Sequence, residues 1–117
     1  MTVRRMKTYT GEQGYAYQYY FVGKRAANQK EQGTEYIFDV TSDRKTTYSV
    51  SVFLGEEPLR QWAARHGRPL NEAEQYGAVK MRLFRAFDEI EDMMAKGRSL
   101  TLEVSQLEDV LKTLGVD

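Results

Sequence analysis

Several residue types are absent or rare in this chain of 117 residues: it has no cysteine, two prolines, one histidine and one tryptophan. Without cysteine the chain has neither disulfides nor thiolate metal sites, and one histidine cannot build a histidine-rich metal centre. No apolar run approaches the roughly 18 residues that a membrane-spanning helix needs, and no apolar segment of a secretion signal follows the basic start. We therefore expect a soluble cytoplasmic protein with no metal, no cofactor and no membrane segment.

Sequence signatures of common enzyme classes are also missing. The chain has no nucleophile elbow, no P-loop and no glycine-rich dinucleotide fingerprint. Carboxylates or tyrosines brought together from separate strands would leave no trace in one sequence, so an acid–base site stays open. The sequence favours a binding role over catalysis.

Charge is balanced overall but unevenly placed. The chain has 17 basic and 17 acidic residues, which removes the usual electrostatic argument for nucleic-acid binding. Residues 1–30 carry six basic residues and one acidic residue, a net charge of +5, whereas residues 86–117 carry three basic and eight acidic residues, a net charge of −5. The two ends can attract each other within one chain or between two copies.

The strongest pattern lies in residues 71–96, where apolar side chains recur at steps of three and four. This stripe consists of Ala73, Tyr76, Val79, Leu83, Phe87, Ile90 and Met94. Asn71 is a good N-cap, Glu74 completes a capping box, and Gly97 suits a left-handed helix end. The pattern predicts one long helix whose stripe packs on an apolar surface.

Alternating patterns predict the strands of a sheet. We expect strands over residues 2–10, 15–22, 34–41, 46–54 and 99–104, and a long exposed loop over the polar residues 23–33. Short helices are predicted over residues 57–66 and 105–114, the second with Ser105 and Glu108 as its capping pair. The order ββββααβα predicts a single α+β domain spanning 1–117. Its four- to five-stranded antiparallel meander is covered on one face by a long helix and two short helices.

One face of this predicted sheet is left open. In the strand over residues 46–54, the alternation separates Tyr48, Val50, Val52 and Leu54 from Thr47, Ser49, Ser51 and Phe53. We expect the first set to face the helices and the second set to face outward. The strand over residues 15–22 contributes to the outward face either Tyr20 or the row Tyr15, Tyr17 and Tyr19, because both of its sides are at least half apolar.

This aromatic strand is the first candidate binding site. Tyrosine is enriched at protein interfaces, so the sequence predicts a small protein-interaction domain that forms a homodimer through a tyrosine-rich sheet face or edge. The alternative is a module for single-stranded nucleic acid that stacks bases on the same rings. The residues of this site are Tyr15, Tyr17, Tyr19 and Tyr20, with Arg4 and Arg5 as phosphate contacts in the alternative.

Two charged clusters are further candidates. The first lies at the end of the predicted short helix and consists of Trp62, Arg65, His66 and Arg68. These residues can bind an anion or border a small-molecule pocket near Trp62. Basic residues at a helix C-terminus more often have a structural role, because they complement the helix dipole. Asp88, Glu89, Glu91 and Asp92 form an acidic run. We interpret this run as a docking patch for the basic N-terminal segment.

Overall fold

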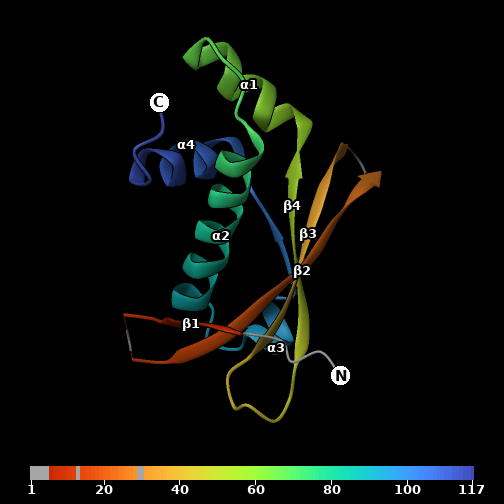
Figure 1. The fold of residues 1–117 in the computed structure, drawn as a ribbon, viewed down its shortest axis with the longest axis vertical. Coiled ribbons are helices and arrows are strands. Elements are labelled where there is room, and N and C mark those ends of the chain that lie inside the picture. The colour runs from red at the N-terminus through yellow and green to blue at the C-terminus, as the bar shows by residue number, and fades with distance from the viewer. Residues whose placement is uncertain (1–5, 13, 29–30) are drawn as a thin grey trace.

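The computed structural model describes residues 6–12, 14–28 and 31–117, and Figure 1 shows its helices and strands. The strands are β1 (Lys7–Thr10), β2 (Ala16–Asn28), β3 (Gln32–Thr41), β4 (Tyr48–Gly55) and β5 (Ser99–Thr101). The helices are α1 (Glu56–His66), α2 (Glu72–Glu89), α3 (Met93–Lys96) and α4 (Val104–Thr113). The predicted α+β class and order of elements are confirmed, with the long helix divided into α2 and the short α3.

The sheet is mixed rather than wholly antiparallel. Its strands lie in the order β1-β2-β3-β4-β5, and the first four pair antiparallel with their neighbours. β5 pairs parallel with β4 because the helices between them carry the chain back before it re-enters the sheet. Helices α1, α2 and α4 all lie on the same side of the sheet (Figure 1).

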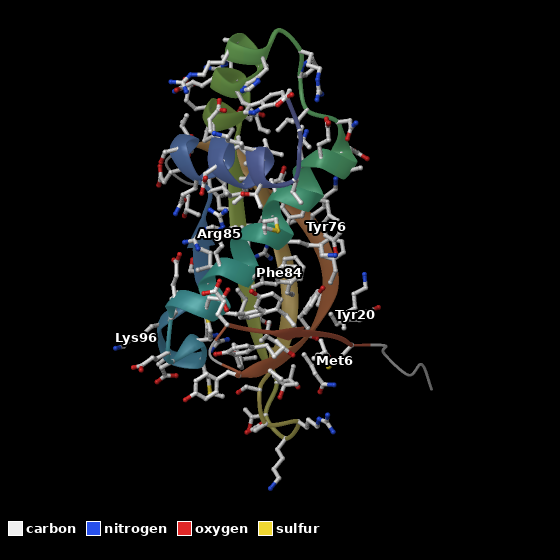
Figure 2. All side chains as sticks on the ribbon, turned by 90° about the vertical axis from the view of Figure 1, so that its left-hand side faces the viewer. Met6, Tyr20, Tyr76, Phe84, Arg85 and Lys96 are labelled. Atoms are coloured by element: carbon white, nitrogen blue, oxygen red, sulfur yellow. The ribbon has the colours of Figure 1, made fainter. Side chains whose placement is uncertain are left out.

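The core lies between this covered side and α2. Phe38, Val50 and Val52 from the central strands are fully buried, as are Val79 and Leu83 from α2. Figure 2 shows Tyr76 and Phe84 projecting from α2 toward the sheet, while Arg85 projects toward α4, where it pairs with Asp109. The predicted stripe is therefore correct through its middle.

The predicted stripe is wrong at its two ends. Ala73 is exposed, and Met94 is 43% exposed. α2 ends at Glu89 and Ile90 is extended, so the prediction of one helix over residues 71–96 is wrong at its C-terminal end. The last turn of α2 holds no basic residue to complement the helix dipole, and the Asp92 side chain instead caps α3 by accepting from the backbone N–H of Ala95.

Two other helix-end predictions were also wrong. Gly97 has φ −115°, which is not left-handed. A Cβ there would lie 2.3 Å from the sulfur of Met93, so a larger residue would require the end of this side chain to shift. α4 is capped by Glu103 with Gln106, rather than by Ser105 with Glu108.

β2 is the largest departure from prediction. Residues 23–33, expected to be a loop, mostly continue β2 and begin β3. A bulge between Phe21 and Gly23 shifts the register, after which Arg25 pairs with Glu35 across the two strands. Backbone pairing with β3 and this cross-strand ion pair hold polar residues in a strand that their own propensities disfavour.

Candidate functional site

The outer face of the sheet, opposite the helices, is the first candidate surface (Figure 1). The strand register assigns its residues. Because Tyr19 and Val40 are paired and buried, the next pair, Tyr20 and Asp39, points outward. Further along β3, Ile37 lies beside Ser51 on the same face.

The apolar centre of the outer face comes from three strands. It consists of Tyr20 and Val22 from β2, Ile37 from β3 and Phe53 from β4. Val22 is 48% exposed, and the other three are half-buried. The Phe53 ring lies over Gly33, where a side chain would come within 2.6 Å of the ring. The absence of a side chain at Gly33 therefore allows the Phe53 ring to pack flat against the sheet, where it adds apolar surface to the outer face.

Charged and hydroxyl groups border this centre. A hollow of about 420 Å³ is lined by Arg25, Glu35, Ile37, Ser49, Ser51 and Arg98. Arg25 Nη2 lies 3.5 Å from Glu35 Oε1, and Arg98 Nε donates to the backbone oxygen of Ser49 at 3.1 Å. An apolar centre with a polar border of both charge signs is the usual anatomy of a protein interface.

The tyrosines predicted to share one exposed surface are separated by the fold. Tyr17 and Tyr19 are 7% and 5% exposed, so the hypothesis that they form a binding surface is corrected: they belong to the core. The Tyr17 ring stacks on Phe87 at 4.3 Å between centroids. Tyr15 precedes β2 and is 68% exposed, and only Tyr20 reaches the outer face.

Arg4 and Arg5, the predicted phosphate contacts, lie outside the described residues.

The second candidate cluster, at the end of α1, is brought together by the fold. The His66 ring stacks on Trp62 at 4.1 Å, and the Arg68 guanidinium lies 5.2 Å from the centre of the same indole. Trp62 itself is 1% exposed, and its indole N–H has no hydrogen-bond partner. The Trp62 ring is therefore part of the core, and its face contacts the side chains of His66 and Arg68.

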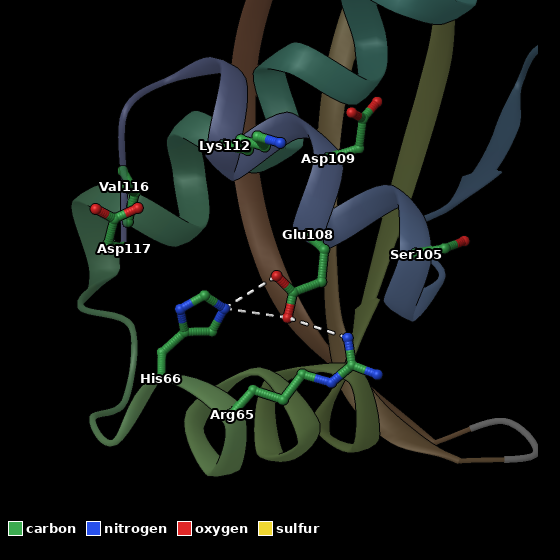
Figure 3. A pocket seen from close by; sticks show the side chains of 8 residues that line it. All are labelled: Arg65, His66, Ser105, Glu108, Asp109, Lys112, Val116 and Asp117. Atoms are coloured by element: carbon green, nitrogen blue, oxygen red, sulfur yellow. Dashed lines mark hydrogen bonds and ion pairs between the residues drawn. The ribbon is translucent and has the colours of Figure 1, made fainter.

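Each basic side chain in this cluster faces a carboxylate. Figure 3 shows His66 Nε2 and Arg65 Nη1 facing Glu108, at 2.9 and 3.8 Å from its oxygens. Arg68 donates a two-pronged hydrogen bond to Glu74 at 2.9 and 3.0 Å, and this contact lowers the pKa of the Glu74 carboxyl. Paired cations of this kind hold α1, α2 and α4 together, which weakens the case for anion binding.

A cavity of about 480 Å³ beside this cluster is drawn in Figure 3. His66, Glu108 and Lys112 are among the residues that line it, whereas Trp62 is not. The predicted small-molecule pocket therefore lacks the aromatic wall that motivated it.

Asp88 of the acidic run forms hydrogen bonds with the described part of the N-terminal segment. Its Oδ2 accepts from the Tyr9 hydroxyl at 2.6 Å, and its Oδ1 accepts from the backbone N–H of Glu12 at 3.2 Å. The hydrogen bond to Asp88 is the main cause that raises the pKa of Tyr9 to about 12. The described part of the N-terminal segment docks on α2 here through a hydroxyl and a backbone N–H.

Sequence reasoning found part of the outer face: Ser49, Ser51 and Phe53, predicted to face outward, do lie there. The alternation in β3 does place Glu35, Ile37 and Asp39 on the side opposite the buried residues, and this signal was sufficient to find them. Arg98 lies 49 residues from its partner Ser49, and Glu108 lies 42 residues from His66, so neither contact left a local signal.

Other kinds of site are not evident in the parts of the chain that the structure covers. Among the described residues, no group of three or more histidine, aspartate or glutamate side chains is placed to hold a metal ion. Within the described ranges, no helix has the length and apolar character needed to cross a bilayer. Comparison with known proteins found no matching family model, curated protein or solved structure.

Proposed function

We propose that the protein is a small protein-binding domain that forms a homodimer through the outer face of its sheet. The observation that carries this proposal is the uncovered apolar centre, in which Val22 is 48% exposed and lies at the bulge next to the paired residues Gly23 and Ile37. Apolar groups grouped on one surface favour contact with another apolar surface, because association removes them from water. A sheet face held flat by its own hydrogen bonds also loses little freedom on binding.

The charges of the outer face favour a second copy as the partner. The face carries charges of both signs, from Arg25 and Arg98 and from Glu35 and Asp39. In a two-fold dimer the same surface meets itself, and a surface with both signs can place opposite charges across such an interface. A surface of one sign would repel its copy.

Single-stranded nucleic acid is the less favoured partner. Of the four predicted tyrosines, Tyr20 alone lies on the outer face, and Glu35 and Asp39 on the central strand repel phosphate groups. A labelled oligonucleotide that binds with a steep salt dependence, weakened by Arg4→Ser with Arg5→Ser, would favour this alternative over the dimer.

Sedimentation velocity over a wide range of protein concentration tests the homodimer. We expect the unchanged protein to move from monomer to dimer as its concentration rises. Val22→Glu places a charge at the centre of the face and should leave a monomer throughout, with unchanged circular dichroism. Met94→Glu is the matched control, because Met94 is 43% exposed on α3, and it should dimerise normally.

Two outcomes would contradict the proposal. The unchanged protein would remain monomeric at every concentration, or Val22→Glu would dimerise as well as Met94→Glu. Val22→Thr keeps the β-branched shape and should weaken the dimer less than Val22→Glu, which separates lost apolar contact from a disturbed strand.

A further inference from the structure

A second cavity lies at the C-terminal end of α2, beside residues 14–17 at the start of β2. Its volume is about 540 Å³. It is lined by residues that lie far apart in sequence, from the start of β2, the last turn of α2 and the segment that follows it. None of these residues belongs to the apolar centre of the outer face, so the inference below does not rest on the proposed homodimer.

Aromatic rings form much of the wall. Tyr15 lines the cavity and is 68% exposed, whereas tyrosine side chains in folded proteins are usually at least partly buried. Tyr17 and Phe87 also line the cavity, and their stacked rings fix one side of it. The face of an aromatic ring carries partial negative charge and attracts cations, most of all where water is partly excluded.

The charged residues that line the cavity are all acidic: Asp88, Glu89 and Glu91. The C-terminal end of α2 adds the partial negative charge of its last carbonyl groups, and the last turn holds no basic residue. Burial, together with the neighbouring Asp88 and Asp92, raises the pKa of the Tyr17 hydroxyl. These groups give the cavity a negative potential that its shape concentrates.

The carboxylates of Asp88, Glu89 and Glu91 differ in whether they already have hydrogen-bond partners within the protein. Asp88 is fixed by Tyr9 and by the backbone of Glu12. Glu89 and Glu91 are exposed, and neither forms a hydrogen bond or ion pair with any residue that the structure describes. Asp88 therefore contributes fixed charge to the wall, while Glu89 and Glu91 have oxygens available to accept from a ligand.

We propose that this cavity binds a cationic side chain, arginine or lysine, from a basic peptide segment of a partner protein. The guanidinium or ammonium group lies against the ring of Tyr15, and Glu89 and Glu91 accept its N–H groups. Aromatic stacking and charge-assisted hydrogen bonds act on the same group, and arginine satisfies both best because its guanidinium is planar. Ile90, which is half-buried at the cavity, contacts the apolar stem of the side chain.

A peptide titration of the full chain tests this site. The probe is the capped peptide Ala-Arg-Arg-Ala. The control peptide has citrulline in place of both arginines, because citrulline has nearly the same shape as arginine but no charge. Amide chemical shifts of the ¹⁵N-labelled protein report where binding occurs. We expect saturable shifts at Tyr15 and Ile90 with the arginine peptide, and binding at least about tenfold weaker with the citrulline peptide.

Free arginine amide separates a peptide partner from a small amine. We expect it to shift the same amides with a lower affinity than the peptide, because it lacks the flanking backbone. Arginine amide that binds as tightly as the peptide would overturn the assignment of a peptide partner.

Matched variants test the carboxylates and the ring. Glu89→Gln with Glu91→Gln should weaken peptide binding at least about tenfold, whereas Glu56→Gln with Glu57→Gln removes the same charge from the start of α1 and should leave it unchanged. Tyr15→Ala should weaken binding several-fold without unfolding the exposed site. Equal effects of the two double variants, equal binding of the two peptides, or no saturable shift at Tyr15 and Ile90 would overturn the proposal.

Discussion

The inner and outer faces of the sheet are made by the same strands but differ in chemistry. On the inner face Phe38, Val50 and Val52 are fully buried beneath the helices. On the outer face Val22 is 48% exposed, and arginine, glutamate and serine side chains line a hollow with Ile37. The inner face therefore carries the stability of the fold, and we propose that the outer face carries binding. A substitution on each face should then affect a different property.

Phe87→Ala should produce the largest loss of stability. Phe87 is 5% exposed and stacks on Tyr17, so its removal leaves a cavity under α2 that should cost about 3–5 kcal/mol. Denaturant unfolding measures the change. Phe53→Ala on the half-buried outer face is the comparison and should cost clearly less; a denaturation midpoint that Phe87→Ala hardly moves would refute the buried stripe.

Asn71→Ala should have a smaller effect, through the helix that covers the inner face. The Asn71 side chain accepts a hydrogen bond from the backbone N–H of Glu74 at 2.8 Å. The Glu74 side chain accepts one from the backbone N–H of Asn71 at 3.0 Å. Loss of this cap should cost about 1 kcal/mol in the free energy of unfolding. Asn71→Asp keeps an acceptor and should retain most of it; if both variants lose the same amount, the cap is not the cause.

The tyrosines that face α2 should make stability fall at alkaline pH. The pKa of Tyr9 rises from an ordinary 10.0 to about 12, chiefly through Asp88, and burial raises the pKa of Tyr48 to about 12. The unfolded chain therefore loses these protons first, so their contribution is complete below pH 10 and is lost as the pH rises toward 12.

Tyr9→Phe should remove part of this alkaline slope. It should also cost about 0.5–1 kcal/mol near neutral pH, because the partly exposed hydrogen bond to Asp88 is lost. Thermal melting between neutral pH and pH 11 measures both effects. The same alkaline slope in Tyr9→Phe and in the unchanged protein would show that Tyr9 does not titrate as proposed.

Val22→Glu should have the smallest effect on stability and so sharpens the contrast between the faces. An exposed side chain outside the core usually changes the free energy of unfolding by less than about 0.5 kcal/mol. Denaturant unfolding of dilute protein, where no dimer contributes, measures this. A loss comparable with that of Phe87→Ala would mean that the outer face belongs to the core.

The sequence predicted those parts of the fold that rest on one repeating pattern. The middle of α2 and the alternation in β4 were both correct, because one side of each element is apolar and the other polar. β2 was different, since aromatic residues occupy both of its sides and only pairing with β3 decides that Tyr19 faces inward and Tyr20 outward. Its bulge also hid the continuation through Arg25.

The candidate sites depended on contacts that a local pattern does not contain. Trp62 and His66 were recognised as a cluster, but Glu108, which neutralises it, lies 42 residues beyond His66. The end of α2 at Glu89 was missed because the apolar spacing continues through Ile90. Cap formation by Asp92 and an unfavourable helix dipole determined that boundary.

Amide chemical shifts of the unchanged protein, recorded from dilute to concentrated solution, test the central claim most directly. The account predicts that concentration-dependent shifts gather on the outer face, at Tyr20, Val22 and Ile37, while buried α2 residues such as Leu83 do not move. Spectra that stay the same at every concentration, or shifts that gather around His66 and Glu108 instead, would contradict it.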